Sequence, residues 1–305
     1  MKTQIIQYTS PFDSQHLKGV YYPSQSAKAL VVVLHGMAEH QQRYQALAEF
    51  LVNHHFDVFT VDHRGHGESL YDGNIKGYFS DEQGWERNVS DVHAMVEIVN
   101  HDKSLPLIVF GHSMGSLMAR SYLKRFPQGV KAVYLSGSPD QSPLAKVGAI
   151  VTALIGLFFG PKHPSPFLTK LSFGTFNSKI VNPKTSMDWL SVDEENVQNY
   201  IKDPLCGFDF TASAFSDLLW GMEDVYRIQS WPTENPMCPI HFVSGEADPA
   251  YQPGGLKKAV ECLQKQGYSN VDFEYIKGMR HEIFNDLSKV QVMEDFVKWL
   301  NHVMV

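Results

Sequence analysis

A serine stands between two glycines at residues 111–115, where the sequence reads GHSMG. The residues before it, LIVF, suit a buried strand, and a helical pattern begins at Met114. A serine at such a strand–turn–helix junction is typical of a nucleophile elbow, whose strained turn needs a small residue at Gly111 and at Gly115. The N-terminus of the following helix would favour negative charge developing beside Ser113. The alternative is a tight turn without a chemical role.

A serine hydroxyl becomes a useful nucleophile only when a neighbouring base takes its proton. Two later strand patterns end in residues that can supply this base and an acid to orient it. CPIHFVSG (238–245) is followed by Glu246 and Asp248. VDFEYIKG (271–278) is followed by His281. The order serine, acid, histidine predicts His281 as general base and Asp248 as its orienting acid. Glu246 is the competing acid, and Asp248 is favoured because it lies further past the strand and precedes a proline.

A tetrahedral intermediate also needs hydrogen-bond donors for its oxyanion. One donor is expected from the backbone N–H of Met114, the residue after Ser113. The second is expected in the loop after ALVVVLH (29–35), where Gly36 allows close backbone approach and the N–H of Met37 follows. The alternative is that this loop merely ends a strand.

The polar segment DHRGHGES (62–69) follows another strand pattern. Its residues His63 and His66 invite a metal hypothesis, but no third ligand has suitable spacing, and the glycines indicate a hydrogen-bonded loop. We therefore expect this segment to brace the sheet beside the site. We expect neither a metal nor a cofactor in the chemistry.

The composition limits the class of protein. A chain of 305 residues, 43% of them hydrophobic, can bury a large core without disulfides, and it suits one domain with a large insertion. The formal net charge of −7 and the lack of a Lys/Arg-rich run argue against a nucleic-acid partner. Three scattered cysteines, and an N-terminal stretch MKTQIIQYTSPFDS without the apolar core of a signal peptide, favour a cytoplasmic location. The oligomeric state stays unknown at this level.

Apolar strand patterns alternate with helical patterns along most of the chain. The strand patterns cover residues 29–35, 57–62, 105–111, 130–137, 238–245 and 271–278, and the helical patterns cover 41–54, 85–101, 114–126, 254–266 and 289–302. Apolar strands that are each followed by a helix predict an α/β fold with a mostly parallel sheet covered by helices on both faces. An antiparallel hairpin around 4–8 and 17–22 is expected at one edge. Such a sheet gathers the polar residues at the carboxyl ends of its strands.

Residues 139–236 interrupt this alternation, with several helical patterns and no convincing strand. We therefore predict an α/β core of residues 1–138 and 237–305 and an inserted helical cap, or lid, of residues 139–236. The apolar run VGAIVTALIGLFFG has 14 residues, fewer than the ~20 needed to span a bilayer. It is expected either to form a lid or lipid-facing surface, or to pack its apolar face on the sheet.

Five motifs together carry a family resemblance. They are HGMAEHQQRY (35–44), DHRGHGES (62–69), GHSMGS (111–116), GEADP (245–249) and MRHEIFND (279–286). In this order, and over nearly the whole chain, they resemble the α/β-hydrolase superfamily and, within it, the monoacylglycerol lipase and bacterial lysophospholipase branch. The stretch DPLCGF (203–208) in the predicted cap is also similar to that branch. The chain departs from the family at Ala38, where glycine is common.

The resemblance implies an α/β-hydrolase fold and a serine hydrolase with Ser113, Asp248 and His281 as its triad. It further implies Met37 and Met114 as oxyanion donors and a helical cap that shapes an acyl-chain tunnel. The expected reaction is hydrolysis of a carboxylic ester with one long acyl chain, from a monoacylglycerol or a lysophospholipid, through an acyl-enzyme. The expected partner is this small amphipathic lipid ester, with transient membrane-surface contact through the cap as a further expectation.

Other functions would use the same residues, because a fold does not fix a substrate. A short-chain carboxylesterase, a thioesterase, an aminopeptidase or an acyltransferase could carry the same serine, acid and histidine. A more distant alternative is a non-catalytic ligand-binding protein on the same scaffold.

Overall fold

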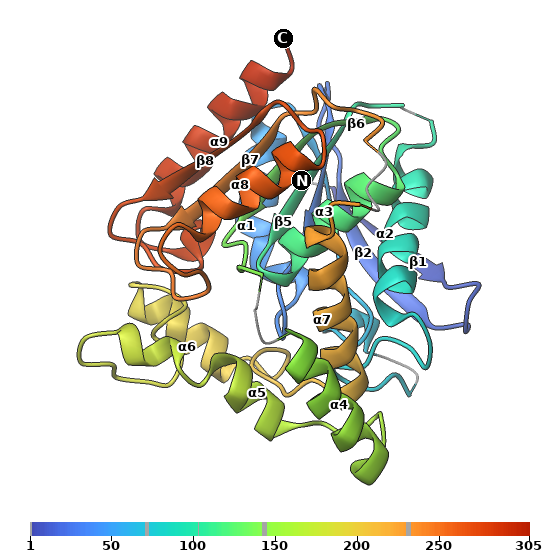
Figure 1. Cartoon of the computed structure of the whole chain (residues 1–305). Helices are drawn as coiled ribbons and strands as arrows, with labels where there is room; N and C mark the ends of the chain where they lie inside the picture. Colours follow the sequence, from blue (N-terminus) through green and yellow to red (C-terminus); the bar gives the residue numbers. More distant parts are fainter. Residues whose placement is uncertain (1, 71–72, 103, 142–144, 230–232) are drawn as a thin grey trace.

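One sheet forms the centre of the molecule (Figure 1). The computed structural model describes residues 2–70, 73–102, 104–141, 145–229 and 233–305, and within them eight strands pair in the order β1-β2-β4-β3-β5-β6-β7-β8. The strands are β1 (Gln4–Thr9), β2 (His16–Tyr22), β3 (Leu30–Leu34), β4 (Asp57–Val61), β5 (Leu107–His112), β6 (Val130–Ser136), β7 (Ile240–Gly245) and β8 (Val271–Ile276). The pairs β1–β2 and β2–β4 are antiparallel, and all the other pairs are parallel. The predicted mostly parallel sheet and its edge hairpin are therefore confirmed.

The central strands are apolar because both faces of the sheet are buried. All five residues of β3 are buried, and successive side chains point to opposite faces. Val32 and Leu34 accordingly join one apolar cluster, and Val31 and Val33 join another. Removing one such side chain from water stabilises the fold by about 1.5–3 kcal/mol, so an unbroken apolar run is favourable only where helices cover both faces.

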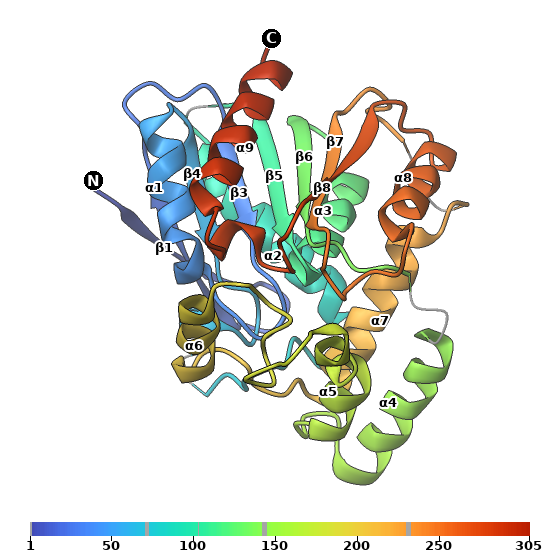
Figure 2. The ribbon, with the colours of Figure 1, turned by 90° about the vertical axis from the view of Figure 1, so that its left-hand side faces the viewer.

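Five helices cover the two faces. They are α1 (Gln45–Asn53), α2 (Gly84–Asn100), α3 (Met114–Arg125), α8 (Gly255–Lys265) and α9 (Lys289–Val303). Helices α1 and α9 pack on the face with Val31 through residues such as Leu51 and Phe296, and Figure 2 shows them side by side in front of the sheet. Helices α2, α3 and α8 cover the other face, with Val89, Leu117 and Leu256 in its apolar cluster.

Four further helices lie between β6 and β7. They are α4 (Ala145–Phe159), α5 (Pro166–Phe173), α6 (Glu194–Lys202) and α7 (Ala212–Tyr226). Figures 1 and 2 place α4, α5 and α6 beyond the carboxyl ends of the parallel strands. Helix α7 differs from them in packing against α2 and α3. It contributes Phe215 and Val225 to the main apolar cluster, to which α5 adds Leu168. The division into core and cap stays a prediction.

The apolar run predicted around residues 147–160 forms most of α4. One side of this helix packs on α7, so closely that a Cβ on Gly148 would lie 2.9 Å from Leu219. The other side is exposed, and α5 adds further exposed apolar side chains. We name the following residues the α4–α5 surface: Val147, Ile150, Leu154, Leu157, Phe158, Phe159, Phe167 and Leu171. In the described residues, no helix combines the length and the apolar character that crossing a membrane would require.

Candidate active site

Ser113 occupies a strained turn between β5 and α3. Its backbone has φ 52° and ψ −118°, a positive φ that a residue with a side chain rarely adopts. The flanking glycines are required by close packing. A Cβ on Gly111 would lie 2.2 Å from the carbonyl oxygen of Gly115, and one on Gly115 would lie 2.0 Å from that of Leu34. The turn therefore holds Ser113, which is partly exposed, at the carboxyl edge of the sheet.

Asp248 and His281 come together from the ends of neighbouring strands, β7 and β8. Oδ2 of Asp248 lies 2.9 Å from Nδ1 of His281. The hydroxyl of Ser244 donates to the same oxygen at 2.6 Å, and the N–H of Ala250 donates to Oδ1 at 2.8 Å. The competing acid, Glu246, is exposed. Of the two acids, it is Asp248 that the structure places against the histidine.

The electrostatics of this pair favour a charged aspartate and a readily protonated histidine. Burial disfavours charge on both groups, but the opposite charge and the hydrogen bond between them outweigh it. The pKa of Asp248 is therefore lowered, and the pKa of His281 is raised above its ordinary value. The neighbouring His112 behaves differently, because burial and the charge of His281 lower its pKa to about 4. His112 is thus neutral near pH 7.

The backbone N–H groups of Met37 and Met114 were the predicted oxyanion donors. Met114 is the first residue of α3, so its N–H has no acceptor within the helix. The N–H of Met37 likewise has no acceptor among the hydrogen bonds of the described residues. The two loops approach each other closely, because a Cβ on Gly36 would lie 3.2 Å from the Cβ of Ser113. Neither N–H thus has an acceptor among the hydrogen bonds of the described residues.

The loop that carries Met37 is held on both sides of that residue. The N–H of Gly36 donates to Oε1 of Glu39 at 2.6 Å. The N–H of Ala38 donates to Nε2 of His66 at 3.2 Å, and its carbonyl accepts from the hydroxyl of Tyr200 at 3.0 Å. Ala38 has φ 54°, a conformation that glycine adopts without strain and that alanine rarely adopts.

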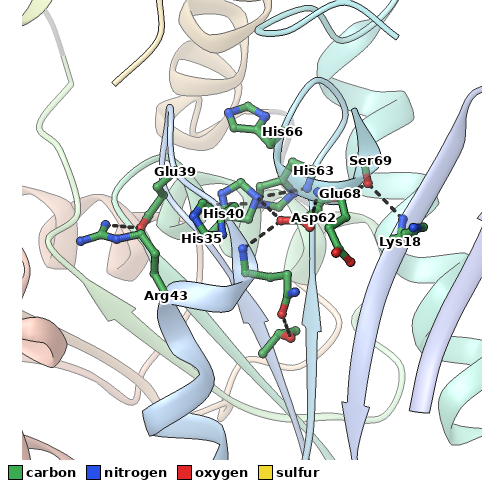
Figure 3. A network of polar contacts seen from close by, with 12 residues as sticks. Lys18, His35, Glu39, His40, Arg43, Asp62, His63, His66, Glu68 and Ser69 are labelled. Carbon is green, nitrogen blue, oxygen red and sulfur yellow. Dashed lines mark hydrogen bonds and ion pairs between the residues drawn. The ribbon is translucent and has the colours of Figure 1, made fainter. Parts of the chain in front are cut away.

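The polar segment after β4, expected from the sequence to brace the sheet beside the site, contacts this loop through His66 and Asp62 (Figure 3). Asp62 accepts the N–H groups of Gln41 and Glu68, each at 2.9 Å. Burial lowers the pKa of His63 to about 3 and that of His66 to about 4. Both imidazoles are therefore neutral near pH 7, which leaves Nε2 of His66 able to accept the Ala38 N–H.

One group in the described residues has side chains close enough to share a metal ion. His40, Asp203 and Cys206 have ligand atoms within 4.8 Å of one another. Nε2 of His40 and Oδ2 of Asp203 are 2.8 Å apart, the distance of a direct hydrogen bond. Burial raises the pKa of the Cys206 thiol, and metal binding needs a thiolate. Nδ1 of His40, whose N–H would need a partner in a metal site, has none among the described residues. This group therefore fits a hydrogen-bonded contact better than a metal site.

Ser113, His281 and Met37 line a cavity of about 200 Å³. Residues from the segment between β6 and β7 form most of its other walls. The apolar lining consists of Phe173, Met187, Trp189, Leu190 and Phe208, and the polar lining includes Thr169, Lys170 and Ser186. The ring of Trp189 lies 5.1 Å from that of His281, measured between centroids. The cavity thus combines an apolar wall with a polar floor at the strand ends, a combination suited to a ligand with one apolar part.

Sequence reasoning did not identify several residues that complete this site. Ser244 is an ordinary strand residue in the sequence, and Trp189 and Tyr200 lie in the segment between β6 and β7. Nothing in their local patterns signals a role, because each acts through a contact with a residue distant in the chain. Arg43 and Glu282 stood within the recognised motifs, but no contact between them was predicted.

Comparisons with known proteins agree with the fold. Residues 25–288 match the Hydrolase_4 family model, described as "Serine aminopeptidase, S33". Human monoglyceride lipase is 36% identical over 301 residues, which cover 95% of this chain and 88% of that protein. The monoacylglycerol lipase of Mycolicibacterium smegmatis is 27% identical over 282 residues, covering 92% of this chain and 91% of the relative. A solved structure of a thermostable carboxyl esterase from Bacillus coagulans has a TM-score of 0.90 and 26% identity, with full coverage of both chains.

The sheet order, the elbow and the polar strand ends are those of an α/β-hydrolase. The chain belongs to the Hydrolase_4 family, in the branch that resembles the monoacylglycerol lipases, and it is a hydrolase.

Proposed function

We propose that this chain is a serine hydrolase that cleaves carboxylic esters with one long acyl chain, such as a monoacylglycerol or a lysophospholipid. The observation that carries this proposal is the buried Asp248–His281 pair, whose histidine lines the same cavity as the strained Ser113. The similarity to monoglyceride lipases supports the ester as substrate, and the apolar lining of the cavity supports the acyl chain.

The proposed reaction follows from the roles of these groups. Oγ of Ser113 attacks the ester carbonyl carbon while His281 accepts the hydroxyl proton. The N–H groups of Met37 and Met114 bind the oxyanion, and Asp248 stabilises the charged imidazole. His281 then protonates the leaving alcohol, which breaks the ester bond and leaves an acyl group on Ser113. Water, activated by the same histidine, attacks this acyl-enzyme and releases the fatty acid.

We also propose that the α4–α5 surface contacts the lipid aggregate from which such a substrate is drawn. Eight large apolar side chains on two adjacent helices are exposed, and a groove of about 420 Å³ lies between α4 and the start of α5. An exposed apolar patch of this kind is typical of an interaction site. Helix α5 also borders the cavity, through Thr169, Lys170 and Phe173, which would shorten the path of an acyl chain from the aggregate to Ser113.

A short-chain carboxylesterase is the second candidate. It is favoured by the similarity in fold and sequence to the Bacillus coagulans carboxyl esterase. Both candidates use the same Ser113 chemistry and differ in what the cavity binds.

The experiment that tests the proposal is kcat/KM for a matched ester series, from acetyl to long-chain monoacylglycerol. Ser113→Ala serves as the blank, and its kcat is expected to fall by about 10⁴–10⁶ while the fold is retained. A rise of kcat/KM with chain length supports the long-chain ester, whereas a maximum at a short acyl group supports the second candidate. A folded wild-type chain that neither hydrolyses any ester nor reacts with a fluorophosphonate at Ser113 would rule out both.

A further inference from the structure

Arg43, in the motif HGMAEHQQRY, has no part in the reaction described above, although its side chain is buried beside the site. Its guanidinium lies between two carboxylates. Nη1 donates to Oε2 of Glu39 and to Oε1 of Glu282, each at 2.6 Å, and Nη2 donates to Oε2 of Glu282 at 2.6 Å. The two carboxylate side chains are each 3% exposed, and that of Arg43 is 10% exposed. Three charged groups this deeply buried and this closely paired require a specific explanation.

One of these carboxylates holds the loop of the oxyanion donor. While Oε2 of Glu39 pairs with Arg43, its Oε1 accepts the N–H of Gly36, directly before Met37. Figure 3 shows Glu39 beside Arg43 in this arrangement. The guanidinium also lies 4.9 Å from the ring centre of Tyr200, whose hydroxyl donates to the Ala38 carbonyl. Arg43 therefore supports the residues on both sides of Met37.

The other carboxylate belongs to the residue after His281. Glu282 forms a bidentate salt bridge with Arg43. Its Oε2 also accepts a hydrogen bond from Nδ2 of Asn196, in α6, at 2.7 Å. The backbone N–H of Glu282 donates to the carbonyl of Leu190 at 2.7 Å. The backbone that carries His281 is thus fixed by the same guanidinium that supports the Met37 loop.

The three charges also act on His281 through space. Four titratable groups face His281. They are Asp248 after β7, Glu282 directly after His281 in the chain, Glu39 on the Met37 loop and His112 at the end of β5. Glu39 and Glu282 both raise the pKa of His281, in addition to the larger effect of Asp248. Arg43 carries the opposite charge and offsets the two glutamates.

We propose that Arg43 is a positioning residue that fixes the Met37 loop and the His281 loop relative to each other through Glu39 and Glu282. This role rests on the proposed function, because it assigns a purpose to the spacing between an oxyanion donor and a general base. A planar guanidinium with five donors can bind two carboxylates in fixed directions, whereas a lysine ammonium cannot reproduce that geometry.

Arg43→Lys tests this role, because it keeps the charge and removes the planar geometry. In a short soluble ester assay, kcat should fall about 10- to 100-fold, as expected when reacting groups are misplaced by a fraction of an ångström or more. KM should change less than about threefold, because binding the ester does not require the two loops to be aligned. The matched control is Arg125→Lys. Arg125 pairs with Asp224 at 3.0 Å, away from the cavity. The kcat and KM of the Arg125→Lys variant should therefore match those of the wild type.

Glu282→Gln supplies a second readout, the pH dependence of fluorophosphonate labelling at Ser113. Removing a negative charge beside His281 should move the acidic limb of the labelling rate to lower pH, whereas Arg43→Lys should leave its position unchanged. An unchanged limb in Glu282→Gln would show that this carboxylate does not act on His281. If thermal unfolding shows that Arg43→Lys does not fold, kcat of the Glu282→Gln variant carries the test, because this variant also weakens the contact with Arg43.

The outcomes separate this inference from the proposed function. If both folded variants keep kcat within about twofold of the wild type, and the limb of Glu282→Gln does not move, Arg43 has no positioning role. If the wild-type chain itself shows neither ester hydrolysis nor labelling, the proposed function fails instead. A loss of kcat in Arg43→Lys together with the limb shift in Glu282→Gln supports the role.

Discussion

Oδ2 of Asp248 lies 2.9 Å from Nδ1 of His281, and both side chains are buried. A carboxylate at this position holds the proton of the neutral imidazole on Nδ1, which leaves Nε2 to accept a proton from a nucleophile. Ser244 fixes the carboxylate from the other side, with its hydroxyl 2.6 Å from the same oxygen. The orientation of the histidine is thus set by a strand residue as well as by the acid.

Replacing Asp248 by asparagine should therefore favour the wrong imidazole tautomer. We expect kcat for ester hydrolysis to fall by about 10⁴, with little change in the overall fold. Glu246→Gln is the matched control, because Glu246 lies two residues away and is exposed, and its kcat should equal that of the wild type. The assignment of the acid would be reversed if Glu246→Gln lost activity and Asp248→Asn did not.

The pH profile should report the raised pKa of His281. A general base must be neutral, so kcat/KM should decrease as the pH falls through the pKa of this histidine. Because Asp248 and its hydrogen bond outweigh the effect of burial, the midpoint of this acidic limb should lie above the ordinary histidine value of about 6.5. A steady-state profile between pH 5 and pH 9 measures it. A midpoint well below the ordinary value would assign the limb to another group.

Met37→Pro removes one of the two proposed oxyanion donors. We expect kcat to fall at least about 10²-fold, the size of effect that follows the loss of one donor to a tetrahedral intermediate. Met37→Leu keeps the N–H and a side chain of similar volume, so it should retain most of the wild-type kcat. The two variants are compared at saturating substrate after their thermal unfolding has been checked. Equal activity of both would remove Met37 from the oxyanion site.

Charge on the α4–α5 surface should weaken activity only on aggregated substrate. Phe158 is 76% exposed, and Phe158→Glu places a carboxylate where contact with lipid would have to desolvate it. We expect kcat/KM to fall for micellar long-chain monoacylglycerol and to stay unchanged for a soluble short ester. Val181→Glu is the control, since Val181 is an apolar residue outside this surface and is 85% exposed. An equal loss in both variants would argue against a specific lipid contact.

The parts of the fold that could be predicted from the sequence are those governed by local patterns. The apolar run before Ser113, the glycines around it and the helix after it all lie within a short stretch, and the strained turn follows from them. Asp248 and His281 were predicted because each follows a strand, and strands of a parallel sheet end at one edge. The structure places both side chains at that edge, in direct contact.

The remaining contacts could not be predicted, because they join distant parts of the chain through side-chain geometry. Arg43 and Glu282 are 239 positions apart, and neither residue's neighbours indicate the other. The path of the segment that carries Trp189 and Tyr200 is set by packing on the strand ends, not by a periodic pattern of its own. The strand and helix patterns fixed the framework of the site, whereas the lining of its cavity required the three-dimensional structure.

The packing of α7 limits which helices between β6 and β7 could be replaced by those of a related protein. Helices α4, α5 and α6 lie beyond the strand ends, whereas α7 packs directly against α2 and α3. Its N-cap residue Thr211 is also tied to the core, because its hydroxyl donates to the carbonyl of Gly77 at 2.9 Å. A chimera made to alter substrate range should therefore keep α7 with its host. Because α4 packs closely on α7, a transplanted α4 must carry side chains that fit the host's α7.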